Sequence, residues 1–131
     1  MYQDRLLAEY RAPKHRREMP DATGNAERKN PVCGDAIRVM VRESDGRLAD
    51  VSFAGHGCSI AVASASLLTQ VVTGADGDEA RALIAQVESM LAGAPVAELP
   101  ELLAPLRGTV PFPARHGCVL MPWLALRDAL G

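Results

Sequence analysis

Several features that would assign this chain to a common class of protein are missing from it. No apolar stretch of about 18 residues runs without a charged residue or a helix breaker, so the sequence predicts no membrane-spanning helix. No long basic run is present, and the net charge of −2 does not favour a nucleic-acid surface. The stretch MYQDRLLAEYRAP is charged throughout and lacks the apolar core of a signal peptide. We therefore expect a cytoplasmic protein that binds neither membranes nor nucleic acid.

Common catalytic and nucleotide-binding motifs are also absent. There is no GxSxG elbow for a serine hydrolase, and Ser64 and Ser66 fall within an expected helix that would bury a nucleophile. No cysteine-protease signature surrounds a cysteine. No G-x-G-x-x-G or phosphate-loop pattern follows an expected strand, which disfavours nucleotide binding.

Cysteine is scarce, with three residues and no CxxC pair. Three cysteines cannot all pair within one chain, and without an export signal this favours a reducing compartment with free or metal-bound thiols. The length of 131 residues and a hydrophobic content of 48% predict one globular domain over residues 1–131.

The hydrophobic pattern predicts a β-hairpin in the first half of the chain. Apolar side chains alternate with others in two neighbouring runs, at Ile37, Val39 and Val41 and then at Ala49, Val51 and Phe53. An Asp-Gly pair between the runs is typical of a tight hairpin turn. The polar, glycine-bearing stretch from Met19 to Pro31 is interpreted as a loop.

Helices are predicted before and after this hairpin in the sequence. A short amphipathic helix should end before Pro13, and residues 59–72 form a nearly apolar, buried helix closed by Gly74. An amphipathic helix is expected over residues 78–91, and a tail helix over residues 114–130, where Pro122 either begins a new helix or kinks one. A short helical segment should face inward through Leu99, Leu102, Leu103 and Leu106. These elements predict an α+β fold, a small antiparallel sheet with helices packed on one face.

Cysteines and a carboxylate are expected to meet at one edge of this sheet. Cys33 and Asp35 precede the first hairpin strand, and Cys58 follows the second, so antiparallel pairing places them side by side. Cys118, in the tail, can fold back to the same edge. Three thiolates and one carboxylate suit tetrahedral Zn²⁺, whereas buried, inert thiols are the alternative.

Histidines are possible competing ligands. His56 and His116 each stand two residues before a cysteine, and we expect a surface or supporting role for both, because four donors are available without them. His15 is given no role. It lies in the charged stretch KHRRE from Lys14 to Glu18, which is interpreted as a solvated loop, with docking of an acidic partner as the alternative.

Three motifs, each centred on a cysteine, carry a family resemblance. NPVCGD, GHGCSIAVASAS and FPARHGCVLMPWLAL, in this order, resemble the SufU branch of the IscU-type iron–sulfur cluster assembly proteins. The resemblance spans nearly the whole chain. IscU-branch members carry a histidine immediately before the last cysteine, where this chain has Gly117. SufU-like members have an arginine three residues before that cysteine, matched by Arg115, and a longer preceding segment, matched by residues 75–110.

The resemblance implies an IscU-like fold of about three strands and a zinc-bound sulfurtransferase that works with a SufS-type cysteine desulfurase and downstream iron–sulfur assembly proteins. The implied zinc ligands are Cys33, Asp35, Cys58 and Cys118. Cys33 would accept the persulfide sulfur, after a histidine of the partner replaces it at the metal. Arg115 would orient the persulfide or balance the cluster's charge, unless it is only a surface arginine.

Two other functions stay open on the same residues. The first is a scaffold on which a [2Fe–2S] cluster is assembled and passed to apo-proteins, because three cysteines and an aspartate can hold iron or a cluster as well as zinc. With iron, His116 would be a possible replacement for Asp35. The second is a structural zinc domain that only binds a partner. Whether the protein is an enzyme depends on which function holds.

Overall fold

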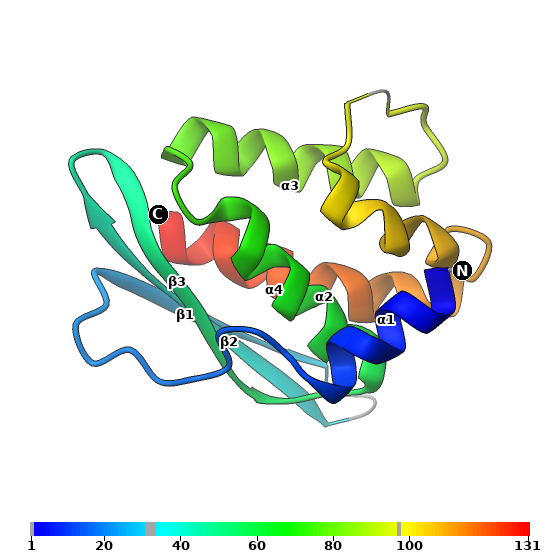
Figure 1. The fold of residues 1–131 in the computed structure, drawn as a ribbon, viewed down its shortest axis with the longest axis horizontal. Coiled ribbons are helices and arrows are strands. Elements are labelled where there is room, and N and C mark those ends of the chain that lie inside the picture. Colours follow the sequence, from blue (N-terminus) through cyan, green and yellow to red (C-terminus); the bar gives the residue numbers. More distant parts are fainter. Residues whose placement is uncertain (1, 31–33, 97) are drawn as a thin grey trace.

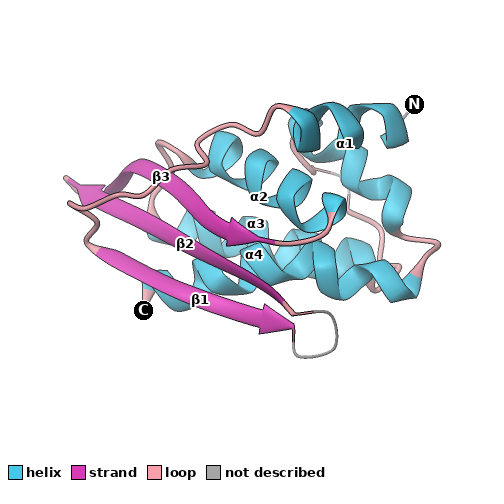
Figure 2. Cartoon of the chain, turned by 90° about the horizontal axis from the view of Figure 1, so that it is seen from below, coloured by secondary structure: helices cyan, strands magenta, loops and turns pink. Residues whose placement is uncertain are grey.

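The computed structural model describes residues 2–30, 34–96 and 98–131 (Figure 1). Strands β1 (Gly24–Asn30), β2 (Asp35–Ser44) and β3 (Arg47–His56) form an open antiparallel sheet in the order β1-β2-β3. Figure 2 shows the helices on one side of this sheet. They are α1 (Tyr2–Arg11), α2 (Ser59–Val72), α3 (Gly77–Leu91) and α4 (His116–Leu130), with 3-10 segments η1 (Glu101–Thr109) and η2 (Pro113–Arg115). The predicted α+β architecture is confirmed.

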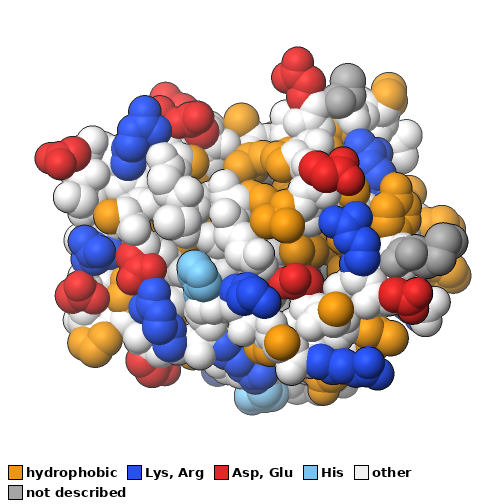
Figure 3. Space-filling model, viewed as in Figure 1, with side chains coloured by type: hydrophobic (Ala, Val, Ile, Leu, Met, Phe, Trp, Pro, Cys, Tyr) orange, Lys and Arg blue, Asp and Glu red, His pale blue; other side chains and the backbone are white. Residues whose placement is uncertain are grey.

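The helices form two layers over the sheet. α4 packs on β1 and β2, α2 packs on β3 and α4, and α3 lies outside them against α4 and η1. α2 is buried almost throughout, as its apolar composition predicts, and Gly74 follows it with a left-handed φ of 93°. Within the described ranges, no helix combines the length and apolar character needed to cross a bilayer. On the face seen in Figure 3, Lys and Arg side chains are interspersed with Asp and Glu.

The predicted hairpin is confirmed, with one shift of register. Asp45 and Gly46 both have left-handed φ angles, of 54° and 77°, as a two-residue type I′ turn requires. The pairing skips Ala49, since Asp50 faces Arg42 and Leu48 faces Glu43. Ala49 is therefore exposed and Leu48 is buried, so the prediction that Ala49 points inward is wrong.

Strand β1 corrects the prediction of a loop from Met19 to Pro31. Its residues alternate between half-buried and exposed, and they pair with β2 along the strand's whole length. The half-buried positions include Gly24, Ala26 and Arg28, which lack the β-branched side chains that identify strands. They are covered by α4, whose Asp128 accepts a 2.8 Å hydrogen bond from Arg28. The strand therefore depends on α4, a distant segment of the chain.

The C-terminal half contains two further corrections. Leu103 and Leu106 are buried and Leu99 is half-buried, but Leu102 is 36% exposed. A 3-10 helix has three residues per turn, so Leu103 and Leu106 share a face that Leu102 does not. α4 runs through the buried Pro122, so the alternative in which Pro122 begins a new helix is wrong. The packing of this helix on the sheet and on α2 offsets one missing backbone hydrogen bond.

The charged stretch from Lys14 to Glu18 is exposed, as expected for a solvated loop, and it also covers a strand edge. The Phe53 N–H in β3 donates to the His15 carbonyl over 3.1 Å, and the Arg17 N–H donates back to the Phe53 carbonyl over 3.0 Å. This bridge protects the outer edge of β3 from pairing with another chain.

Candidate metal centre

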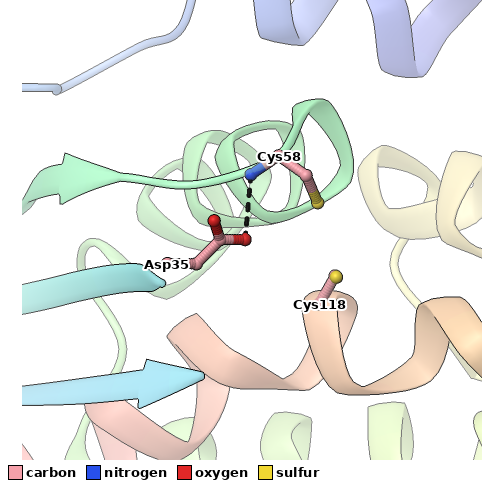
Figure 4. Close-up of side chains that lie close together, drawn as sticks. All are labelled: Asp35, Cys58 and Cys118. Carbon is pink, nitrogen blue, oxygen red and sulfur yellow. Dashed lines mark hydrogen bonds between the residues drawn. The ribbon is translucent and has the colours of Figure 1, made fainter. Parts of the chain in front are cut away.

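Three side chains from distant elements converge at one end of the sheet. Asp35 is the first residue of β2, Cys58 is the N-cap of α2, and Cys118 lies in the first turn of α4. One ligand atom from each lies within 4.8 Å of the others (Figure 4). Cys33, the fourth residue of the expected ligand set, lies outside the described residues. The structure thus brings together three of the four, and their role as metal ligands stays a prediction.

Strand pairing explains why Asp35 and Cys58 are neighbours. Ala36 pairs with His56, so the start of β2 lies beside the end of β3 and the loop into α2. The Cys58 N–H donates to Asp35 Oδ2 over 3.1 Å (Figure 4). The carboxylate is only 9% exposed, and it also receives the favourable field of the α2 N-terminus. Asp35 is therefore fixed against the same loop that carries the Cys58 thiol.

A buried serine explains why Cys118 reaches the same place. Ser64 Oγ–H, in α2, donates to the Val119 carbonyl over 2.8 Å, and it accepts the Trp123 indole N–H over 3.0 Å. Ser64, Val119 and Trp123 are all fully buried. This bridge fixes α4 against α2 beside Cys118. The sequence predicts only that Ser64 is buried and unusable as a nucleophile, but a polar residue in an apolar helix is itself an indication of a buried hydrogen bond.

Both thiols open onto a cavity of about 420 Å³. Its apolar lining comes from α1, α2 and the segment after η1, and includes Leu6, Leu7, Ile60 and Phe112. Among the described residues that line it, Arg115 carries the charge, and its guanidinium lies 4.9 Å from the centre of the Phe112 ring. A cation therefore lines the same largely apolar cavity as the two thiols.

The histidines lie near the cluster without joining it. Among the described residues, the group of close donor atoms contains Asp35, Cys58 and Cys118 but no histidine. His56 Nε2 lies 3.0 Å from the Gly34 carbonyl, and His116 Nε2 makes similar contacts with two carbonyls. The expectation of supporting positions is consistent with these contacts.

The donor set fits zinc in chemistry and in spacing. Neighbouring sulfur ligands of tetrahedral zinc lie about 3.8 Å apart, because Zn–S bonds are about 2.3 Å long. The observed limit of 4.8 Å requires only a small contraction of the cluster. Two thiolates and a carboxylate are ordinary zinc ligands, and thiolates also hold iron–sulfur clusters. The geometry therefore admits both metals.

Comparison with known families decides the relationship. The NifU-like N terminal domain model matches residues 1–104, which include Asp35 and Cys58. The chain belongs to the NifU-like N-terminal domain family.

Relatives within this family have two different names. The iron–sulfur cluster assembly scaffold protein IscU of Streptococcus pyogenes is 32% identical over 95% of this chain and 80% of its own length. The zinc-dependent sulfurtransferase SufU of Bacillus subtilis is 31% identical over 99% of this chain and 89% of its own length. A putative scaffold protein for the SUF system from Fervidobacterium islandicum has the same fold, with a TM-score of 0.88 at 28% identity, covering 96% of this chain and 94% of that one. The resemblance to the IscU and SufU proteins is confirmed, and the level of identity does not separate the two names.

Proposed function

We propose that residues 1–131 form one IscU/SufU-like domain that binds zinc and accepts persulfide sulfur from a SufS-type cysteine desulfurase, for iron–sulfur cluster assembly. The observation that carries this proposal is the convergence of Asp35, Cys58 and Cys118, whose two cysteines line a cavity together with Arg115. The 31% identity with a zinc-dependent sulfurtransferase over nearly the whole chain supports the same function.

Each residue has a separate task in this proposal. Cys33, Asp35, Cys58 and Cys118 would hold the metal, with Cys33 assigned from the family motif. When bound, zinc keeps thiols deprotonated at neutral pH and has no redox chemistry of its own. Asp35 supplies an oxygen donor that the Cys58 N–H holds in place. These three described donors form the fixed part of the site.

Sulfur transfer is proposed to end on Cys33. Its thiolate attacks the outer sulfur of the desulfurase persulfide, and a new S–S bond forms as the old one breaks. The desulfurase cysteine leaves as a thiolate, and Cys33 keeps the sulfur as a persulfide. The step exchanges one thiolate for another and therefore needs no oxidant or reductant. Arg115, which lines the same cavity as Cys58 and Cys118, would bind the anionic persulfide through its guanidinium.

A [2Fe–2S] scaffold is the second candidate. It is favoured by the 32% identical relative that bears the scaffold name, and the donor set does not exclude it. Gly117 favours the first candidate, because IscU-like proteins are expected to have a histidine at that position.

Metal content and desulfurase kinetics together separate the candidates. We expect the protein to purify with about one zinc and to accelerate cysteine turnover by the desulfurase, and Cys33→Ala to abolish the acceleration. Arg115→Ala should slow sulfur transfer about tenfold, which corresponds to one lost charged hydrogen bond of about 1.4 kcal/mol. Arg127→Ala, which removes an exposed arginine from α4, the helix that follows Arg115, should have no effect.

Two outcomes would overturn parts of this assignment. An iron-loaded protein that passes a cluster to an apo-acceptor and does not accelerate the desulfurase would establish the scaffold instead. Full acceleration by Cys33→Ala would show that Cys33 is not the acceptor.

A further inference from the structure

We infer that His56 and His116 are paired positioning residues, each of which braces one cysteine-bearing loop by a hydrogen bond from its imidazole to a backbone carbonyl. They occupy equivalent places in the sequence, two residues before Cys58 and two residues before Cys118. The inference assigns them to neither the ligand set nor the reacting groups. It holds whether the site carries zinc or an iron–sulfur cluster, and so does not depend on the proposed function.

His116 forms hydrogen bonds across the segment of residues 109–116 that leads into α4. Its Nε2 lies 3.1 Å from the Thr109 carbonyl oxygen and 3.0 Å from that of Val110. Carbonyl oxygens only accept hydrogen bonds, so Nε2 must carry a hydrogen and donate it. A ring nitrogen that carries a hydrogen cannot coordinate a metal through the same atom.

The segment that His116 closes carries two residues of the cavity wall. The Phe112 N–H donates to the Thr109 carbonyl over 2.9 Å, and the Arg115 N–H donates to the Phe112 carbonyl over 2.9 Å. The His116 imidazole therefore links the start of α4 back to residues 109–110, across the two turns whose hydrogen bonds orient Arg115. No side-chain hydrogen bond caps α4, because its N-cap is Arg115. His116 thus supplies the fixation that a capping side chain gives to other helices.

His56 makes the corresponding contact at the start of β2. Its Nε2 lies 3.0 Å from the carbonyl oxygen of Gly34, which directly precedes Asp35. α2 also lacks a side-chain cap, because its N-cap is Cys58, whose own N–H is taken by Asp35. The imidazole therefore ties the end of β3 to the start of β2, and it holds Asp35 against the Cys58 loop.

The functional consequence follows from the places where the thiols lie. Helix starts and loops are the parts of a fold that open most easily, and both described cysteines lie at helix starts. Residues that orient metal ligands from outside typically contribute about 10-fold to 100-fold in metal affinity. Two braces, one at the start of β2 and one at the start of α4, therefore keep the donor atoms within ligand spacing.

Amide hydrogen exchange in the metal-free, reduced protein tests the pair without relying on activity. His116→Leu should speed exchange of the Arg115 amide about fivefold, the size expected when one hydrogen bond limiting local opening is lost. The Cys58 amide should be unaffected. His56→Leu should give the reverse pattern, so that each variant is the control for the other. His116→Gln and His56→Gln, which retain an N–H donor, should restore most of the protection.

Zinc affinity, measured by competition with a chelator, is the second readout. Each Leu variant should bind zinc about tenfold more weakly with the same number of sulfur ligands, and His15→Asn should bind normally. If either Leu variant speeds hydrogen exchange equally at the Arg115 and Cys58 amides, or at neither amide, the inference is overturned. Loss of a nitrogen ligand from the X-ray absorption spectrum of the zinc protein on His116→Leu would also overturn it, by showing that the histidine is a ligand.

Discussion

Replacing Ser64 by alanine should loosen the contact that brings Cys118 beside Cys58. Ser64 is fully buried and bridges two partners, the Trp123 indole N–H and the Val119 carbonyl. Removal of the hydroxyl leaves the indole N–H without its serine partner in a fully buried place, which costs about 1–3 kcal/mol. Loss of the bond to Val119 adds about 1 kcal/mol. We therefore expect Ser64→Ala to lower the free energy of unfolding by about 2–4 kcal/mol.

A double-mutant cycle separates the hydrogen bond from the packing. Trp123→Phe removes the donor, so Ser64→Ala should cost only about 1 kcal/mol in that background. The coupling energy between the two positions should be about 1–3 kcal/mol. Ser89→Ala, at an exposed position of α3, should change the free energy of unfolding by less than about 0.5 kcal/mol.

Urea unfolding followed by far-UV circular dichroism is the appropriate assay, because Trp123 is the only tryptophan and the cycle removes it. All variants must be compared without metal, since ligand binding adds to apparent stability. A loss of 2 kcal/mol should lower the urea midpoint by about 1 M for a slope of about 2 kcal/mol/M. A coupling energy below about 0.5 kcal/mol would refute the claim that Ser64 is the partner that satisfies the buried indole.

Three further substitutions test separate features. The pKa of Asp76 is lowered, first by the Glu79 backbone N–H, so its contribution to stability is present above pH 3.8 and is lost as pH falls through the folded pKa. Asp76→Asn should therefore lose less stability than the wild type on acidification in urea titrations. Gly55→Ala should cost at least about 3 kcal/mol in the same assay, because its Cβ would lie 2.1 Å from the Ala36 carbonyl oxygen at a φ of 109°. Gly117→Ala, whose Cβ meets nothing within 4 Å, should instead be neutral or stabilising by up to about 1 kcal/mol.

Local rules were sufficient to predict one half of the cluster. A two-residue turn brings the start of β2 beside the end of β3, so the proximity of Asp35 and Cys58 follows from the strand pattern. The exact pairing of Ala36 with His56 depends in addition on the bulge at Ala49, which shifts the register by one residue. The position of Cys118 is different, because it depends on the docking of α4. That docking uses Ser64 and Trp123, which are 59 residues apart in the chain. The periodic spacing of apolar residues in the sequence does not predict a hydrogen bond between residues so far apart.

The elements that were predicted wrongly share a physical cause. Strand patterns are recognised by large apolar side chains, but the inward positions of β1 include Gly24, Ala26 and Arg28. Their burial is created by α4, which lies across them. The bulge at Ala49 shifts the strand register by one residue, and the 3-10 geometry around Leu102 shortens the helical period from 3.6 to about 3 residues per turn. Patterns that assume ideal strand or α-helix periods then assign the wrong face.

The positive charges around the cluster bear on how a metal site with four protein ligands can release one of them for reaction. α2 and α4 both begin at the cluster, and each helix N-terminus contributes about half a positive charge. Under the proposed function, these N-termini and Arg115 would offset part of the negative charge of a ligand set made of thiolates and Asp35. The repulsion among the three described donors is therefore reduced, and under the proposed function they can hold the metal while the fourth ligand, Cys33, leaves it to react. An entering persulfide brings negative charge to the cavity side of the cluster, where Arg115 supplies the compensating cation. The arrangement thus favours an anionic sulfur group over a neutral thiol, a preference that Arg115→Ala should reduce.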